Sequence, residues 1–179
     1  MKKSDFLTLS NLLSLLRIFL AIPIFVYISQ SDTNLLLLVI FIAVITDFLD
    51  GYFARKFNQI TELGKILDPF ADKVCTTAGF IALTIYQGFP YWITIVIILR
   101  DIFILLGSFF IFKKEKFVPP SNTPGKFTVF FISLLAIVHI LKWEEFFWPI
   151  VALVLLSIIY SAYNYFLIFI KNLNPNKNE

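Results

Sequence analysis

Long apolar stretches separated by short polar breaks make up most of the chain. Six of these stretches come close to the roughly 20 residues that an α-helix needs to cross the hydrocarbon core of a bilayer. They predict helices at 8–29, 35–57, 63–87, 91–112, 125–141 and 146–170. The breaks hold residues typical of turns and helix caps, such as Gly88 and Pro90. The pattern therefore predicts an all-α integral membrane protein with six transmembrane helices.

The composition supports a membrane protein over a water-soluble one. Of the 179 residues, 59% are hydrophobic and 15% are charged, which is too few charges to cover the surface of a soluble domain of this size. The first apolar stretch is too long for the core of a signal peptide, so we expect it to be retained. No repeat and no second compositional region stands out, so residues 1–179 are interpreted as a single domain.

Basic residues gather on one side of the predicted membrane. Because Lys and Arg in short loops mark the cytoplasmic side, we expect both termini in the cytoplasm. The opposite side carries only Lys142. The basic residues on the cytoplasmic side are Lys2, Lys3, Arg55, Lys56, Lys65, Lys113, Lys114, Lys116, Lys126, Lys171 and Lys177. The net charge is +3, from 15 Lys and Arg against 12 Asp and Glu. We expect no nucleic-acid partner.

Four aspartates interrupt the second and third apolar stretches. Asp47 and Asp50 are three residues apart and Asp68 and Asp72 are four apart, so each pair occupies one helix face. Ionisable groups inside a spanning helix are costly and are therefore candidate functional residues. The loop between the two helices is short, which predicts antiparallel neighbours. We expect the four carboxylates to converge near the cytoplasmic side.

Four like charges in a low-dielectric setting require compensating cations. Carboxylates without a nearby His or Cys favour hard ions, so we expect two Mg²⁺ or Mn²⁺ ions, which commonly serve phosphate chemistry. Basic residues that could hold a phosphorylated ligand are Arg55, Arg100 and Lys126. The alternative is that the aspartates form structural ion pairs with Arg17, Arg55 and Lys73. Four aspartates on two facing stripes favour the metal site over this alternative.

The segment from Asp47 to Asp72 resembles the signature of the CDP-alcohol phosphatidyltransferase family. Eight residue identities match within 26 positions: Asp47, Asp50, Gly51, Ala54, Arg55, Gly64, Asp68 and Asp72. The stretch from Asn11 to Arg17 is similar to the N-termini of this family. The resemblance implies a homodimeric enzyme that transfers a phosphatidyl group from CDP-diacylglycerol to an alcohol and releases CMP. It also implies a bacterial inner membrane, with the active site facing the cytoplasm.

The resemblance assigns roles to individual residues. Asp47, Asp50 and Asp68 would bind metal, while Asp72 would share a metal ion and act as the general base. The residues implied to surround the CDP-lipid are Gly51, Ala54, Arg55 and Gly64. Arg100 and Lys126 resemble the basic positions with which members of the family hold an acceptor phosphate.

The acceptor stays open, with two alcohols favoured over inositol phosphate and serine. A phosphorylated acceptor and the short chain favour glycerol 3-phosphate, which would give phosphatidylglycerophosphate. Arg100-Asp101 departs from the Arg-Glu often found in such enzymes. Together with Ser161-Ala162-Tyr163, it also resembles cardiolipin synthases that use phosphatidylglycerol.

Two other classes of membrane protein compete with an enzyme. A cation channel or transporter would need polar residues through both halves of the membrane, whereas the outer halves of the second and third helices are nearly all apolar. A scaffold without chemistry would leave four costly aspartates unexplained.

Overall fold

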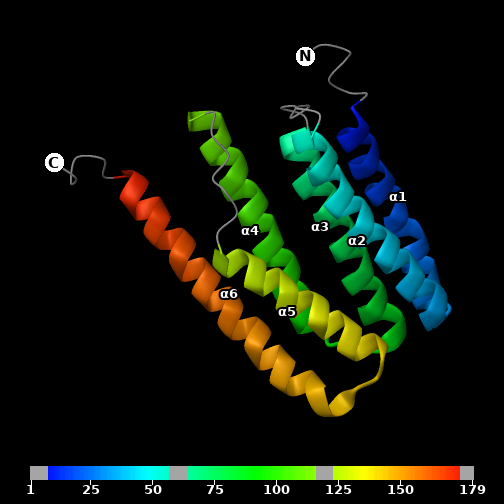
Figure 1. Cartoon of the computed structure of the whole chain (residues 1–179). Coiled ribbons are helices and arrows are strands. Elements are labelled where there is room, and N and C mark those ends of the chain that lie inside the picture. Colours follow the sequence, from blue (N-terminus) through cyan, green and yellow to red (C-terminus); the bar gives the residue numbers. More distant parts are fainter. Residues whose placement is uncertain (1–7, 57–63, 116–122, 174–179) are drawn as a thin grey trace. The chain divides into compact units, whose positions relative to one another are not determined.

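The computed structural model describes residues 8–56, 64–115 and 123–173. These residues form six α-helices and no strand (Figure 1). The helices are α1 (Leu9–Ser29), α2 (Thr33–Lys56), α3 (Gly64–Gln87), α4 (Tyr91–Glu115), α5 (Thr123–Ile140) and α6 (Glu144–Leu173). Every end lies within three residues of its predicted position, so the all-α prediction is confirmed.

Polar residues in the breaks satisfy the free backbone groups at the helix starts. The Asn11 amide donates to Thr8 Oγ1 at 3.3 Å at the start of α1. The Leu35 amide donates to Asp32 Oδ1 at 3.1 Å at the start of α2. Between α3 and α4, Gly88 has a φ of 70°, a left-handed conformation that glycine adopts without the steric cost of a side chain. The short breaks therefore act as caps and turns, as their composition predicts.

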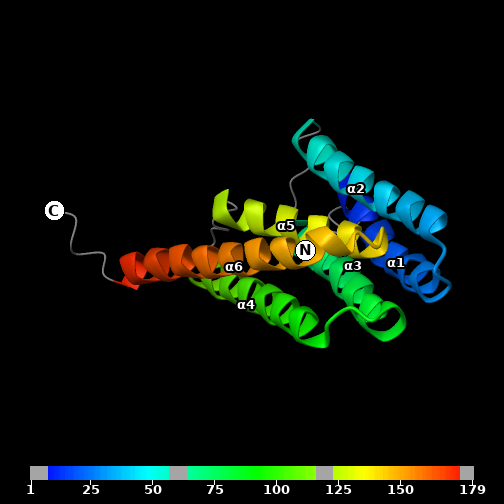
Figure 2. The same cartoon turned by 90° about the horizontal axis from the view of Figure 1, so that it is seen from below.

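The chain forms two compact units, Met1–Val118 and Pro119–Glu179, and each is described by itself. In the first unit α1 packs against both α2 and α3, and α3 also packs against α4. Figure 2, which turns the view by 90°, again shows α1 alongside α2 and α3. In the second unit α5 and α6 pack against each other. In the first unit, α1 thus connects the two helices that carry the aspartates.

Large apolar side chains cover the outside of these helices. Phe19, Phe41, Phe48, Phe70 and Phe103 are each at least half exposed. The fully buried apolar side chains of α1, α2 and α3 include Ile28, Leu36, Ala71, Ala82 and Leu83. An apolar exterior of this kind suits lipid contact rather than water.

Three helices of the described segments are long and apolar enough to cross a membrane. These spans are Asn11–Ser29, Thr33–Asp50 and Glu144–Asn164. A shorter apolar stretch, Pro124–Ile140, belongs to α5. The protein is therefore a membrane protein, as the apolar pattern predicts.

A buried leucine and an exposed isoleucine on the same helix test the packing of α3. Leu83 is 2% exposed and Ile85 is 61% exposed. We expect Leu83→Ala to lower the free energy of unfolding in detergent by about 2 to 5 kcal/mol, because it leaves a cavity. Ile85→Ala should stay within about 0.5 kcal/mol of the wild type, because that side chain lies outside the core. Thermal or denaturant unfolding of both variants would measure the difference, and equal losses would contradict the packing of α3.

Candidate active site

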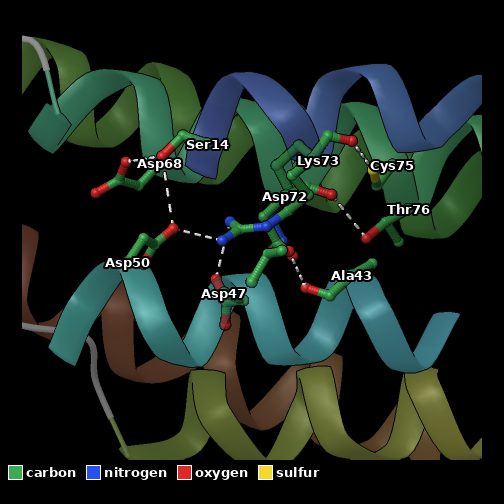
Figure 3. A network of polar contacts seen from close by, with 11 residues as sticks. Ser14, Ala43, Asp47, Asp50, Asp68, Asp72, Lys73, Cys75 and Thr76 are labelled. Atoms are coloured by element: carbon green, nitrogen blue, oxygen red, sulfur yellow. Dashed lines mark hydrogen bonds and ion pairs between the residues drawn. The ribbon is translucent and has the colours of Figure 1, made fainter. Parts of the chain in front are cut away.

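A buried arginine of α1 joins the two aspartates of α2. The side chain of Arg17 is only 2% exposed. Its Nη1 lies 2.9 Å from Asp47 Oδ1, and its Nη2 donates a short hydrogen bond to Asp50 Oδ2 (Figure 3). Asp50 is 5% exposed and Asp47 61% exposed. The guanidinium therefore contacts both carboxylates from the buried side, while the Asp47 side chain stays accessible to a ligand.

A serine one turn before this arginine extends the network to α3. The hydroxyl of Ser14, which is fully buried, makes a short hydrogen bond to Asp68 Oδ1 and lies 3.5 Å from Asp50 Oδ2. A hydroxyl has a single proton to donate, so it serves one carboxylate at a time. Ser14 thus links Asp68 of α3 to Asp50 of α2, and three of the four predicted aspartates contact α1.

The fourth aspartate lies beside a second group of charges. Lys73 Nζ is 3.8 Å from Asp72 Oδ2 and 2.9 Å from Asp101 Oδ1. Arg100 Nη1 donates to the same Asp101 oxygen at 2.7 Å. Asp101 is 4% exposed, whereas the side chain of Asp72 is 44% exposed. Asp72 is therefore accessible to a ligand, while Asp101 is a buried anchor for two cations.

The two groups of charges contain more acids than bases. Among the side chains that the structure describes here, five carboxylates accompany three cations: Asp47, Asp50, Asp68, Asp72 and Asp101 with Arg17, Lys73 and Arg100. With every group ionised, an excess of negative charge remains. An added cation would reduce the repulsion between the carboxylates.

Oxygen donors without nitrogen or sulfur suit a hard divalent ion, so the chemistry of the aspartates fits Mg²⁺ or Mn²⁺. In the structure, however, Asp47 and Asp50 are paired with the guanidinium of Arg17. Within residues 8–56, 64–115 and 123–173, no three His, Cys, Asp or Glu side chains are grouped closely enough to hold a metal ion. The sequence left open that the aspartates form structural ion pairs instead of a metal site. Such ion pairs are present for Arg17 and Lys73.

Two predicted site residues can be placed beyond the aspartates. Gly64 is the first residue of α3 and is buried. Arg100 lies in α4 within the first unit and takes part in the Asp101 group.

The other predicted positions are less fully described. Gly51, Ala54 and Arg55 belong to the last turns of α2, but their side chains lie outside the described part of the structure. Lys126 is exposed on α5, in the second unit.

Two residues take part in the site in ways that the sequence did not predict. Ser14 carried no prediction, although a polar residue three positions before Arg17 in an apolar stretch is a usable signal for a shared helix face. Asp101 stood out in the sequence as an ionisable residue in apolar surroundings beside Arg100, but its pairing with Lys73 was not predicted. Arg100 and Lys73 both contact its carboxylate.

Residues 7–165 match the family model described as CDP-alcohol phosphatidyltransferase. The chain belongs to this family. The match spans both compact units and includes all four aspartates. The family predicted from the signature is confirmed, and the protein is a membrane phosphatidyltransferase rather than a channel or a scaffold.

Named relatives fall into two groups of enzymes. The chain is 44% identical over 128 residues to the CDP-diacylglycerol--glycerol-3-phosphate 3-phosphatidyltransferase of Aquifex aeolicus, covering 69% of this chain and 70% of the relative. A protein of the same name from Mycoplasma pneumoniae is 35% identical over 139 residues, with 66% and 61% covered. A cardiolipin synthase (CMP-forming) of Streptomyces coelicolor is 35% identical over 133 residues, with 69% and 60% covered. No solved structure matches the chain.

Removal of the Asp101 carboxylate tests whether the second group of charges stabilises the fold. We expect Asp101→Asn to cost about 3 to 5 kcal/mol of unfolding free energy, because the buried carboxylate shared by two partly buried cations is lost. Asp32→Asn is the matched control, since asparagine caps a helix as well as aspartate does. Thermal unfolding in detergent would measure both. Adding Lys73→Met to Asp101→Asn should recover part of the loss, and a further loss instead would contradict the pairing.

Proposed function

We propose that this protein transfers the phosphatidyl group of CDP-diacylglycerol to glycerol 3-phosphate, with two Mg²⁺ or Mn²⁺ ions as cofactors. The observation that carries the proposal is the collection of Asp47, Asp50 and Asp68 from α2 and α3 around one polar patch of α1. The fourth aspartate, Asp72, lies on α3 beside Lys73. The name of the Aquifex aeolicus relative supports glycerol 3-phosphate as the acceptor. The product would be phosphatidylglycerophosphate, and CMP would leave.

The proposed topology has six spans with both termini in the cytoplasm of a bacterium, and the inner membrane as the location. The basic residues at both ends of the chain support this orientation. The site lies near the end of α2 and the start of α3, on the side of the membrane that this orientation makes cytoplasmic. A lipid could keep its acyl chains in the bilayer there while its head group reaches the aspartates. By family resemblance the enzyme would be a homodimer.

The carboxylates would hold the ions, and Asp72 would also handle the proton. Asp47, Asp50, Asp68 and Asp72 are the proposed ligands. Bound there, divalent ions would withdraw charge from the β-phosphate and stabilise the oxygen that leaves with CMP.

Asp72 suits the role of general base because its carboxylate is 44% exposed and within reach of an incoming hydroxyl. It would accept the acceptor's proton as the hydroxyl oxygen bonds to the β-phosphorus and the bond from that phosphorus to the CMP oxygen breaks.

Basic and small residues would bind the two substrates. Gly51, Ala54, Arg55 and Gly64 are the proposed surroundings of the cytidine diphosphate. Arg100 and Lys126 are proposed to hold the phosphate of the acceptor, which favours a phosphorylated alcohol.

A second candidate acceptor is phosphatidylglycerol, which would make the enzyme a cardiolipin synthase. The specific observation in its favour is the Streptomyces coelicolor relative, which carries that name at 35% identity. A phosphodiester could use the same basic residues as a phosphomonoester, although it carries less charge.

CMP release distinguishes these acceptors. Purified protein with CDP-diacylglycerol and Mg²⁺ should release CMP when glycerol 3-phosphate is added, and release should stop with a chelator. Phosphatidylglycerol, inositol phosphate and serine are the comparison acceptors. Release driven by phosphatidylglycerol alone would establish the second candidate. No release with any acceptor, from folded protein, would contradict both.

Two aspartate variants test the proposed division of roles. Asp72→Asn should lower the turnover number by about 100-fold or more, because the general base is lost, while CDP-lipid binding is largely kept. Asp47→Asn should lose the metal-dependent part of CDP-lipid binding. Binding and turnover measured side by side give the comparison, with Asp32→Asn as a control outside the site. An equal loss of binding in both site variants would refute the division.

A further inference from the structure

Arg17 holds a position that its own hydrogen bonds do not fully explain. A guanidinium has five N–H donors, and burial without partners is costly for each of them. The side chain is 2% exposed, and neither Nε nor Nη1 makes a hydrogen bond within the described residues. Nη1 has only its ion pair with Asp47, and Nη2 donates to Asp50. Part of the donor capacity of this buried cation is therefore available to an additional acceptor.

The same two carboxylates are also proposed metal ligands. The guanidinium of Arg17 contacts both Asp47 and Asp50. Ser14 links Asp50 to Asp68, and Figure 3 shows these three residues together. A divalent ion needs ligand oxygens at about 2.0 to 2.2 Å. An ion bound to Asp47 and Asp50 would therefore stand within a few ångströms of the guanidinium and repel it. The ion and the guanidinium would therefore compete for the carboxylate oxygens that Arg17 now contacts.

We propose that Arg17 is the exchangeable counter-cation of this site: it pairs with Asp47 and Asp50 when no divalent ion is bound, and the ion displaces it. The proposal rests on the proposed function, because that function requires the ion. In the metal-free protein Arg17 pairs with both carboxylates and holds α1 against α2. After displacement its free donors can face the anionic diphosphate that accompanies the ion. Arg17 is thus a positioning residue that makes metal binding depend on a rearrangement of α1 side chains.

Metal affinity in the absence of lipid substrate tests the exchange directly. Binding of Mn²⁺ to purified protein in detergent can be followed by the electron paramagnetic resonance signal of the free ion. Arg17→Gln removes the competing cation, and we expect it to bind Mn²⁺ about tenfold more tightly than the wild type. The matched control is Arg100→Gln, which removes the same charge from the same unit but from the Asp101 group. Its affinity should stay close to that of the wild type.

A second variant and a second readout guard against loss of folding. Arg17→Lys keeps the positive charge but loses the fork that spans two carboxylates, so it should also bind Mn²⁺ more tightly than the wild type. In thermal unfolding, Mn²⁺ should raise the midpoint of Arg17→Gln by more than it raises that of the wild type or Arg100→Gln. This difference is expected because the metal-free state alone depends on the Arg17 pairs.

The outcomes separate this proposal from the proposed function. Wild-type or weaker Mn²⁺ affinity in both Arg17 variants would overturn the exchange, even if the enzyme releases CMP. An equal gain in Arg100→Gln would also overturn it, because the effect would then reflect overall charge. Absence of Mn²⁺ binding in the wild type and in both Arg17 variants would overturn it as well. Tighter binding in the Arg17 variants together with no CMP release would support the exchange and contradict only the transferase reaction.

Discussion

The burial of Arg17 between acidic residues is the interaction on which the first unit depends. Carboxylates on apolar helices are costly in a membrane unless a cation or hydrogen-bond donor meets them. Arg17 meets two of them from α1, and Ser14 on the same face meets a third. Cys75 of α3 donates from its thiol to the Arg17 carbonyl oxygen at 2.7 Å, which adds a contact between α1 and α3. One polar face of α1 therefore holds α2 and α3 in the positions that define the site.

The association of α3 with α4 depends on a different balance of forces. An open groove of about 390 Å³ runs between these helices, and apolar residues such as Phe70 and Ile98 line most of it. Lys73 and Asp101 also line this groove, where their ion pair connects the two helices. The apolar side chains of α3 and α4 leave this groove open between them, and the ion pair adds a directional contact beside it. The helices of the first unit are thus oriented by polar contacts set within apolar surroundings, which fix one arrangement better than non-directional packing does.

Much of this fold and the identity of its acidic residues followed from the sequence because both depend on local patterns. Helix positions follow from apolar length and from caps such as Asp32, so their ends were predicted within three residues. The aspartates followed from their i, i+3 and i, i+4 spacing. The role of α1 could not be predicted in this way, because the spacing of the aspartates within α2 and α3 contains no information about which other helix packs against them. The short loop between α2 and α3 suggested two helices facing each other, whereas α1 packs against both.

On the proposed exchange, the ion pairs and the catalytic interpretation would describe the same residues in two states of one site. A site that must accept divalent ions needs several carboxylates close together, and these would repel one another before any ion arrives. An internal cation such as Arg17 reduces this repulsion and allows the helices to pack. A cation held too firmly would prevent the site from binding metal. Asp47 is more than half exposed and Arg17 retains unused donors, so the pairing stabilises the fold without closing the site. Arg17 is then the group that would occupy the proposed metal site before an ion arrives and that keeps Asp47 and Asp50 together inside a membrane protein.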